Sequence, residues 1–398
     1  MSAPNSFEPV ARLSADPAIN RQLELNAKRA LLRDQTEVID QLADGFDYNT
    51  ARHGYWNPEN FSLLWGTPLW KEATETQRLT LNHLYWVAYY SQIVSAEIAT
   101  IFFNQVAAAG LYKAGEDFRR LCDTLDLESR QERAHIHAFT HIGEAVEKAL
   151  FGERLFTRAM RGPYGATMVF NGESSLSNAW RSAQIRVFSA TAPERPTLAA
   201  HYLMIRGLRT LNGKMIQERL ARFVDEFQDP TLAPAPALVS QAHYVDESFH
   251  FNTSRIASHE IPRLLPKPTA IERFAINRAV AGCQRDHTPF SAAINGIFWH
   301  DPALFEACWK LFRSPIFGME AAEATRMLHR CFGEETEAMS ASASSHETAI
   351  ANYRAYVEKA DVLDADNRDM ARMASSTIDK RLKINRAALA RFTPAAVH

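Results

Sequence analysis

The sequence predicts an all-α protein. Apolar residues recur at intervals of three and four positions along most of the 398-residue chain, and helix-favouring Leu, Ala, Glu, Arg and Gln are common. No convincing stretch alternates apolar and polar residues as a half-buried strand does. Prolines and glycines interrupt the helical pattern at a few places, where we expect turns.

The helical pattern occupies eight stretches, which are residues 18–45, 76–110, 114–150, 173–190, 197–228, 234–258, 268–297 and 366–393. Residues 166–171 form the only stretch that we expect to be extended. The small and polar run Met339–Ser345 indicates a flexible connection to C-terminal helices. We expect one helical domain over 1–398, with a core at about 76–260 and a C-terminal helical extension at about 301–398.

Composition and charge exclude several classes of protein. The net charge is −2 and nearly half the residues are apolar, which indicates a soluble globular protein with no electrostatic attraction to nucleic acid or an anionic membrane. The N-terminus lacks a basic segment followed by an apolar core, so we expect no signal peptide and a cytoplasmic protein. No Cys-x-x-Cys occurs, and we expect reduced core thiols at Cys122, Cys283, Cys308 and Cys331.

The predicted helix around Glu97 needs separate treatment, because Glu97 is the only charged residue between Leu79 and Tyr112. Its length suits a membrane span, but the stretch is too polar for one, with His83, Ser91, Gln92, Asn104 and Gln105. We therefore expect a helix buried inside a bundle. A carboxylate there is costly without a partner, so Glu97 is either a metal ligand or a protonated or salt-bridged core residue.

Three residues at positions i, i+4 and i+7 of one predicted helix, His243, Glu247 and His250, share one face. A lone histidine is usually a core or surface residue, but two imidazoles beside a carboxylate indicate a metal site. A Glu-x-x-His pair is weak by itself, since a chain with 14 histidines contains about one by accident. This chain has two, Glu132–His135 and Glu247–His250, each within a predicted helix.

A complete site needs one further carboxylate from each of two other helices. Glu97 precedes the first pair by 35 positions and supplies one. For the second we favour Glu218, because it lies about as far before the proline-rich turn at 229–236 as Glu247 lies after it. Glu173 is a distant competitor, and Glu194 lies between prolines outside the helix.

Two Glu-x-x-His helices and one Glu from each of two others form the ligand set of carboxylate-bridged di-iron bundles. The sequence therefore predicts a ferritin-like di-iron helical bundle with additional N- and C-terminal helices. Carboxylates and imidazoles suit iron. Asp246 can accept the free ring N–H of His135 across the bundle. The seven predicted ligands are Glu97, Glu132, His135, Glu218, His243, Glu247 and His250.

The order of these motifs, with His243-Tyr-Val-Asp-Glu247-Ser-Phe-His250, resembles the p-aminobenzoate N-oxygenase family. The resemblance covers about residues 76–260 and is specific in the ligand helices, where His243 matches an additional histidine of that family. It implies a ferritin-like enzyme that uses two iron ions and O2 to oxidise an amine to a hydroxylamine, nitroso or nitro product. The longer stretch between His135 and Glu218 departs from the family pattern, which leaves the substrate open.

Several partners and alternatives follow from this interpretation. Returning the irons to the diferrous state takes two electrons, so we expect an external donor of the ferredoxin or flavin reductase type, a small-molecule amine substrate and a homodimer. Arg206, Arg209 and Arg255 are candidates to pair with a substrate carboxylate, although most helical arginines lie in water. The alternatives are a di-iron hydroxylase or desaturase acting on a C–H bond, a radical protein with a nearby tyrosine, a storage protein and a non-catalytic helical scaffold.

Overall fold

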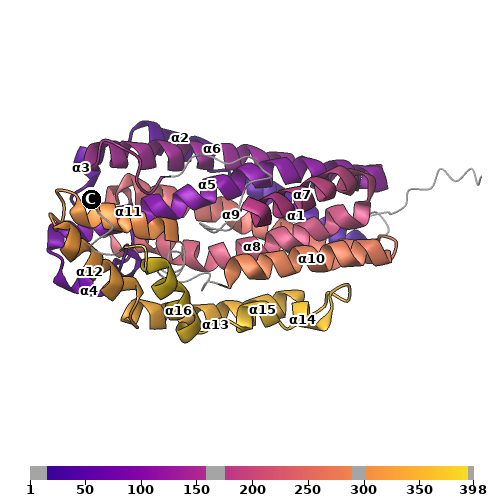
Figure 1. Cartoon of the computed structure of the whole chain (residues 1–398). Helices are drawn as coiled ribbons and strands as arrows, with labels where there is room; N and C mark the ends of the chain where they lie inside the picture. Colours follow the sequence, from indigo (N-terminus) through magenta and orange to yellow (C-terminus); the bar gives the residue numbers. More distant parts are fainter. Residues whose placement is uncertain (1–15, 158–174, 289–301, 393–398) are drawn as a thin grey trace, which may run out of the picture.

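The computed structural model describes residues 16–157, 175–288 and 302–392, and within these ranges the chain is helical and contains no strand (Figure 1). The prediction of an all-α helical bundle is confirmed. Residues 166–171, which we expected to be extended, lie outside the described ranges, as does Glu173. The helices run largely along one long axis, which gives the molecule its elongated shape (Figure 1).

Four long helices carry all the predicted ligands: α5 (Glu75–Ala114), α6 (Arg119–Leu150), α8 (Pro196–Arg222) and α9 (Ala235–Glu260). Helix α5 packs on α6 and α8, and α9 packs on α8 and α6. Short connections make α5 antiparallel to α6 and α8 antiparallel to α9 (Figure 1). A Cβ at Gly110 would lie 2.4 Å from the carbonyl oxygen of Ala192 and 2.8 Å from Ala199 Cβ, so only glycine permits this approach of α5 to the start of α8.

Helix α5 is the only described helix that is long and apolar enough to cross a membrane by length and composition. Thr74 caps it in a capping box with Gln77. Its residues 80–92 are buried, and so are Glu97 and Asn104 further along. Polar side chains enclosed by neighbouring helices are what a bundle core contains, and over residues 80–97 they agree with the prediction of a buried bundle helix, whereas most of residues 98–109 are half-buried or exposed.

The N-terminal part adds α1 (Pro17–Leu32), α2 (Thr36–Asp44), α3 (Tyr48–Ala51), η2 (Glu59–Phe61) and α4 (Pro68–Glu72). The sequence predicts one helix over 18–45, but the chain turns at residues 33–35. Asp34 accepts hydrogen bonds from the backbone N–H and the hydroxyl of Thr36, which stabilises the turn. Helix α2 packs on α6 and α9, so this turn lies against the ligand helices.

The other helices flank the core, α7 from between α6 and α8 and the rest from after α9. They are α7 (Ser175–Thr191), α10 (Ala270–His287), α11 (Pro302–Arg313), α12 (Ala321–Phe332), α13 (Glu337–Val357), α14 (Ala365–Arg368), α15 (Ala371–Ala374) and α16 (Ile378–Leu389). The single helix predicted over 366–393 is instead broken into three, and Met370, which is buried with φ 52°, precedes α15. The C-terminal helices lie along one side of the bundle (Figure 1).

The expected flexible connection at Met339–Ser345 is wrong, because these residues lie inside α13. Thr336 caps this helix by accepting a hydrogen bond from the backbone N–H of Met339. Alanine is the best helix former, and Met339 and Ser342 are buried against the rest of the protein. A run of small residues was therefore a close-packed helix face.

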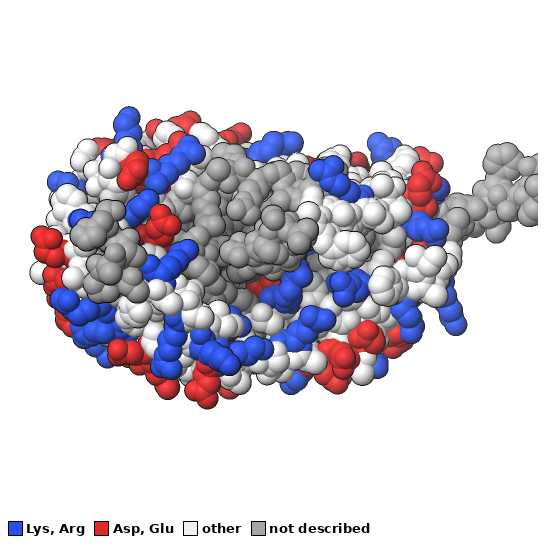
Figure 2. Space-filling view, in the orientation of Figure 1, with Lys and Arg blue, Asp and Glu red and all other residues white. Residues whose placement is uncertain are grey.

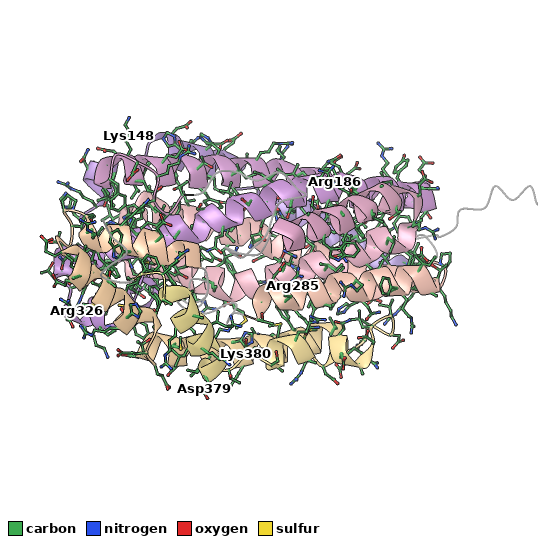
Figure 3. All side chains as sticks on the ribbon, viewed as in Figure 1. Lys148, Arg186, Arg285, Arg326, Asp379 and Lys380 are labelled. Carbon is green, nitrogen blue, oxygen red and sulfur yellow. The ribbon has the colours of Figure 1, made fainter. Side chains whose placement is uncertain are left out.

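On the face shown in Figure 2, positively and negatively charged residues are interspersed over the described surface. The charged residues labelled in Figure 3 lie on the outer sides of α6, α7, α10, α12 and α16. All four cysteines are free and buried, as predicted. The candidate site is defined by charged and titratable groups that are instead buried between the four core helices.

Candidate metal centre

Six of the seven predicted ligands converge inside the bundle, and they come from three helices. Helix α5 contributes Glu97, α6 contributes Glu132 and His135, and α9 contributes His243, Glu247 and His250. All six residues are buried. The spacings of three, four and seven positions put the donors of each helix on the side that faces the other helices.

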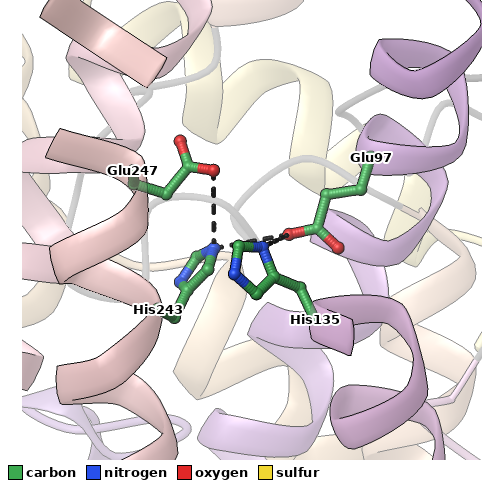
Figure 4. Close-up of side chains that lie close together, drawn as sticks. All are labelled: Glu97, His135, His243 and Glu247. Atoms are coloured by element: carbon green, nitrogen blue, oxygen red, sulfur yellow. Dashed lines mark ion pairs between the residues drawn. The ribbon is translucent and has the colours of Figure 1, made fainter. Parts of the chain in front are cut away.

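Glu97, His135, His243 and Glu247 form one group, named here the His135 group, whose donor atoms all lie within 4.8 Å of one another (Figure 4). Glu97 Oε1 lies 3.5 Å from His135 Nδ1 and 3.3 Å from His243 Nε2. His243 Nε2 also lies 3.8 Å from Glu247 Oε1. Two imidazole nitrogens and two carboxylates around one point can hold a metal ion.

Glu132, Glu247 and His250 form a second group, the His250 group, within the same distance limit. His250 Nδ1 lies 2.9 Å from Glu247 Oε1 and 3.5 Å from Glu132 Oε1. The other oxygen of Glu132 lies 3.3 Å from His135 Nδ1 in the first group. Both Glu132 and Glu247 thus contact histidines of both groups, as carboxylates that bridge two metal ions do.

Several donor atoms of the His135 group lack hydrogen-bond partners among the described residues, which a bound metal ion would replace. Both carboxylate oxygens of Glu97 and both ring nitrogens of His243 are buried without a hydrogen-bond partner in the described part of the chain. Buried polar atoms normally have such partners, because leaving one unpaired costs about 1–3 kcal/mol. A bound cation would satisfy these atoms, so the residues present fit a metal centre.

Two of the buried carboxyl groups, those of Glu97 and Glu132, differ in their affinity for protons. Burial raises the pKa of Glu97 to about 8, and the nearby His135 only partly opposes this. Burial acts in the same direction on Glu132, but hydrogen bonds from His135 and His250 outweigh it and hold the pKa of Glu132 well below its usual range. In the metal-free protein, Glu97 therefore carries a proton near neutral pH.

The three histidines also differ. Burial lowers the pKa of His135, but hydrogen bonds to Asp246 and the neighbouring carboxylates raise it well above the usual value. The pKa of His250 is likewise raised, since Glu247 and its neighbours outweigh burial. The pKa of His243 is lowered by burial and by the nearby imidazoles. Protons thus occupy the metal-free site, and metal binding must release them.

We expect the metal-free protein to become less stable as pH rises from about 6.5 to about 8.5. The pKa values of Glu97, His135 and His250 are all raised by folding, so the folded state binds more protons than the unfolded state in this range, and its stability falls as they are lost. Urea unfolding of chelator-treated protein measures the effect. Metal-loaded protein is the control, because its ligands are already deprotonated. Equal metal-free stability at both pH values contradicts the prediction.

Glu218 is the predicted ligand that does not join either group. Its side chain is 39% exposed and its carboxylate accepts a 2.7 Å hydrogen bond from Arg222, one turn further along α8. The competitor Glu194 is exposed and pairs with Lys113. A ligand from α8 therefore stays a prediction.

Asp246 and Gln131 lie behind the ligand histidines. Asp246 Oδ2 lies 3.2 Å from His135 Nε2, on the side of the ring away from Glu97. Gln131 Oε1 lies 2.9 Å from Nε2 of His250. The sequence analysis missed Gln131, although its position directly before Glu132 matches that of Asp246 before Glu247.

A second buried polar cluster lies beside the donors and was also missed. Arg206 of α8 donates to Glu128 at 2.6 Å, to Asn104 at 2.8 Å and to the Ser254 hydroxyl at 2.8 Å. It also donates to the backbone carbonyl of His250 at 3.2 Å. These contacts occupy Arg206, so its interpretation as a partner for a substrate carboxylate is wrong. It holds all four core helices together at one level.

Aromatic and apolar residues form the layer next to the donors. Val94 precedes Glu97 by nearly one turn of α5, and Phe139 follows His135 by one turn of α6. The Phe139 ring stacks on Tyr90 and lies 5.0 Å from the His243 ring. Val94 and Phe139 line a small pocket together with Ser91, Thr140, Glu144, Arg154 and Thr157. This pocket brings an apolar surface to within one helical turn of the donors.

The fold and the site together define a class, namely helical-bundle proteins with a buried centre of carboxylates and imidazoles. A family model described as acyl halogenase, CylC-like, matches residues 18–393. The chain therefore belongs to the CylC-like acyl halogenase family, which is a family of enzymes. No curated protein and no solved structure matches the chain.

The family match corrects one expectation. The chain is not a member of the p-aminobenzoate N-oxygenase family, because the match to the acyl halogenase family extends over nearly the whole chain. The expectation rested on the ligand residues and on His243, and such residues are dictated by the metal rather than by the substrate. The prediction of an enzyme is confirmed.

Proposed function

We propose that this protein is an iron-dependent halogenase that replaces a hydrogen on carbon of an acyl substrate with a halogen atom. The observation that carries the proposal is the buried pair of His/Glu groups within a chain of the CylC-like acyl halogenase family. The donors are imidazole nitrogens and carboxylate oxygens without thiolates, a set that suits iron. Two groups that share Glu247 favour two ions rather than one.

The overall reaction must balance in electrons. Replacing C–H by C–X with a halide ion removes two electrons, and O2 takes up four when it forms two water molecules. The reaction R–H + X⁻ + O2 + 2e⁻ + 3H⁺ → R–X + 2H2O therefore needs two electrons from an external donor, for which we propose a ferredoxin or flavin reductase. Bound iron would supply the redox chemistry that activates O2.

The residues of the chain have separate roles in this proposal. Glu132 and Glu247 would hold the two ions close together, because each contacts histidines of both groups. Glu97 and His243, whose donor atoms lack other hydrogen-bond partners in the described residues, would complete the His135 group. The buried aromatic layer of Tyr90 and Phe139 would keep bulk water away from the donors.

In this proposal an acyl chain reaches the donors past Phe139, where a small pocket of about 30 Å³ lies. Its floor is formed by Val94 and Phe139, and its outer side carries Glu144 and Arg154, which are exposed and form an ion pair. An apolar chain that entered between these polar residues would place a carbon near the donors.

We expect iron-loaded protein, supplied with a reductant, O2, chloride and acyl substrates of several chain lengths, to give a chlorinated product. Mass spectrometry checks this through the chlorine isotope pattern, and replacing chloride by bromide should shift the product mass accordingly. Omitting iron is the control. A hydroxylated or unsaturated acyl product without halogen would favour the alternative of a di-iron hydroxylase or desaturase.

A further inference from the structure

The two ligand helices are related by a local pseudo-symmetry that sequence spacing alone reveals only in part. In each helix, the residue directly before the glutamate of the Glu-x-x-His pair reaches across to the histidine of the other helix. Asp246 of α9 contacts His135 of α6 at 3.2 Å, and Gln131 of α6 contacts His250 of α9 at 2.9 Å. The two backing residues differ in charge, since one is a carboxylate and the other a neutral amide.

The orientation of the Gln131 amide is fixed by its neighbours. Its nitrogen lies 3.0 Å from Asp246 Oδ1 and 3.3 Å from Asp34 Oδ1, and carboxylates only accept hydrogen bonds when ionised. The amide oxygen must therefore face His250 Nε2, which must carry the hydrogen. The other ring nitrogen of His250, Nδ1, faces Glu247 and Glu132, on the side where a metal ion would bind.

The same reasoning applies to His135 with a different result. Asp246 Oδ2 can only accept, so His135 Nε2 carries the hydrogen and Nδ1 faces Glu97 and Glu132. A carboxylate behind a ligand imidazole pulls on this proton and makes the opposite nitrogen a stronger donor. A neutral amide oxygen, such as that behind His250, does so less.

The two groups also differ in the number of protein donors, and this difference again favours the His135 group. The His135 group offers four residues and the His250 group three, with Glu247 common to both. The group with the negatively charged backing residue thus also has the additional imidazole of His243. Both differences favour tighter binding at the His135 group, and both leave the His250 group more open to exchange.

We propose that Asp246 and Gln131 are positioning residues that make the two metal positions unequal, with a tight position at the His135 group and a weaker, exchangeable position at the His250 group. This proposal rests on the two-ion centre of the proposed function. The asymmetry comes from residues that need not touch metal themselves, so isosteric substitutions can change it without removing a ligand.

The test is an anaerobic titration of the metal-free full-length protein with Fe²⁺ against a competing chelator. Wild-type protein should bind two ions in two separate steps. Asp246→Asn keeps the shape but removes the charge behind His135, and should weaken the tighter step by about 10–100-fold, the usual effect of losing such a backing group. The triple variant Asp34→Asn/Asp246→Asn/Gln131→Glu moves the charge behind His250 without placing it against another carboxylate, and it should strengthen the weaker step relative to Asp246→Asn.

Gln131→Glu is tested only in this combination, because alone it would place a carboxylate against Asp246 and Asp34. Asp44→Asn is the matched control, since Asp44 makes the same carboxylate–imidazole contact to His137 at the surface, and both binding steps should remain as in wild type. Circular dichroism checks that each variant is folded. A folded triple variant with unchanged order and affinities overturns the inference while the two-ion centre survives. Wild-type protein that binds no iron, or one ion only, overturns the proposed function itself.

Discussion

Glu247→Gln protein is expected to lose most of its bound iron. Glu247 is the one residue common to both ligand groups, and its Oε1 atom lies 2.9 Å from His250 Nδ1 and 3.8 Å from His243 Nε2. Glutamine has the same size but no charge, and it offers one oxygen instead of a shared carboxylate. Elemental analysis of purified protein should therefore show the iron content fall from two ions to less than one per chain.

The matched control is Glu144→Gln, which makes the same chemical change at an exposed residue that pairs with Arg154, and it should retain full iron content. Because Glu247→Gln removes a buried charge and keeps the side-chain volume, we expect it to remain folded, which circular dichroism verifies. A folded Glu247→Gln protein with two tightly bound ions would show that the two groups are not a shared metal centre.

Glu218→Gln decides the ligand prediction that the structure leaves open. Glu218 was predicted because it lies as many positions before the turn at 229–236 as Glu247 lies after it. In the structure α8 already ends at Arg222, and the connection contains two 3-10 turns, η5 (Phe223–Glu226) and η6 (Pro230–Leu232). A 3-10 turn advances and rotates differently from an α-helix, and Glu218 pairs with Arg222 instead of joining either ligand group. Loss of one ion in Glu218→Gln would confirm Glu218 as a ligand.

The other donors could be predicted because one helix fixes the relative directions of residues three, four and seven positions apart. This rule placed His243, Glu247 and His250 on one face before any packing was known. The single carboxylate in the otherwise uncharged stretch between Leu79 and Tyr112 identified Glu97. Relations between helices, such as the contact of Gln131 with His250, depend on rotation about each helix axis and could not be read from spacing.

Spacing along the sequence could predict neither the positions where helices are broken nor the substrate. The turn after α1 is stabilised partly by Asp246, which accepts a hydrogen bond from the backbone N–H of Gln35 more than 200 positions earlier. The spacing of apolar residues within 18–45 therefore could not predict this turn. The ligand stripe likewise constrains the metal and leaves the reaction open, which is why it fitted an N-oxygenase as well as a halogenase.

Arg206→Met protein is expected to have a much lower free energy of unfolding than the wild type. Arg206 and Glu128 are both buried and form a 2.6 Å ion pair between α8 and α6. Methionine fills much of the volume of arginine but leaves the Glu128 carboxylate without its charged partner. Breaking a buried ion pair in this way costs about 3–5 kcal/mol, which urea unfolding of metal-free protein would detect as a lower free energy of unfolding.

The double variant Arg206→Met/Glu128→Gln separates this charge effect from lost packing. It removes both charges, so no uncompensated carboxylate remains buried, and it should be more stable than Arg206→Met alone even though it carries one more substitution. Arg222→Met is the surface control: Arg222 pairs with Glu218 where water screens both charges, and its loss should cost less than about 1 kcal/mol. If Arg206→Met proved as mild as Arg222→Met, the contacts of Arg206 would not be what holds the four core helices in register. The register of the donors would then have to come from the apolar layers alone.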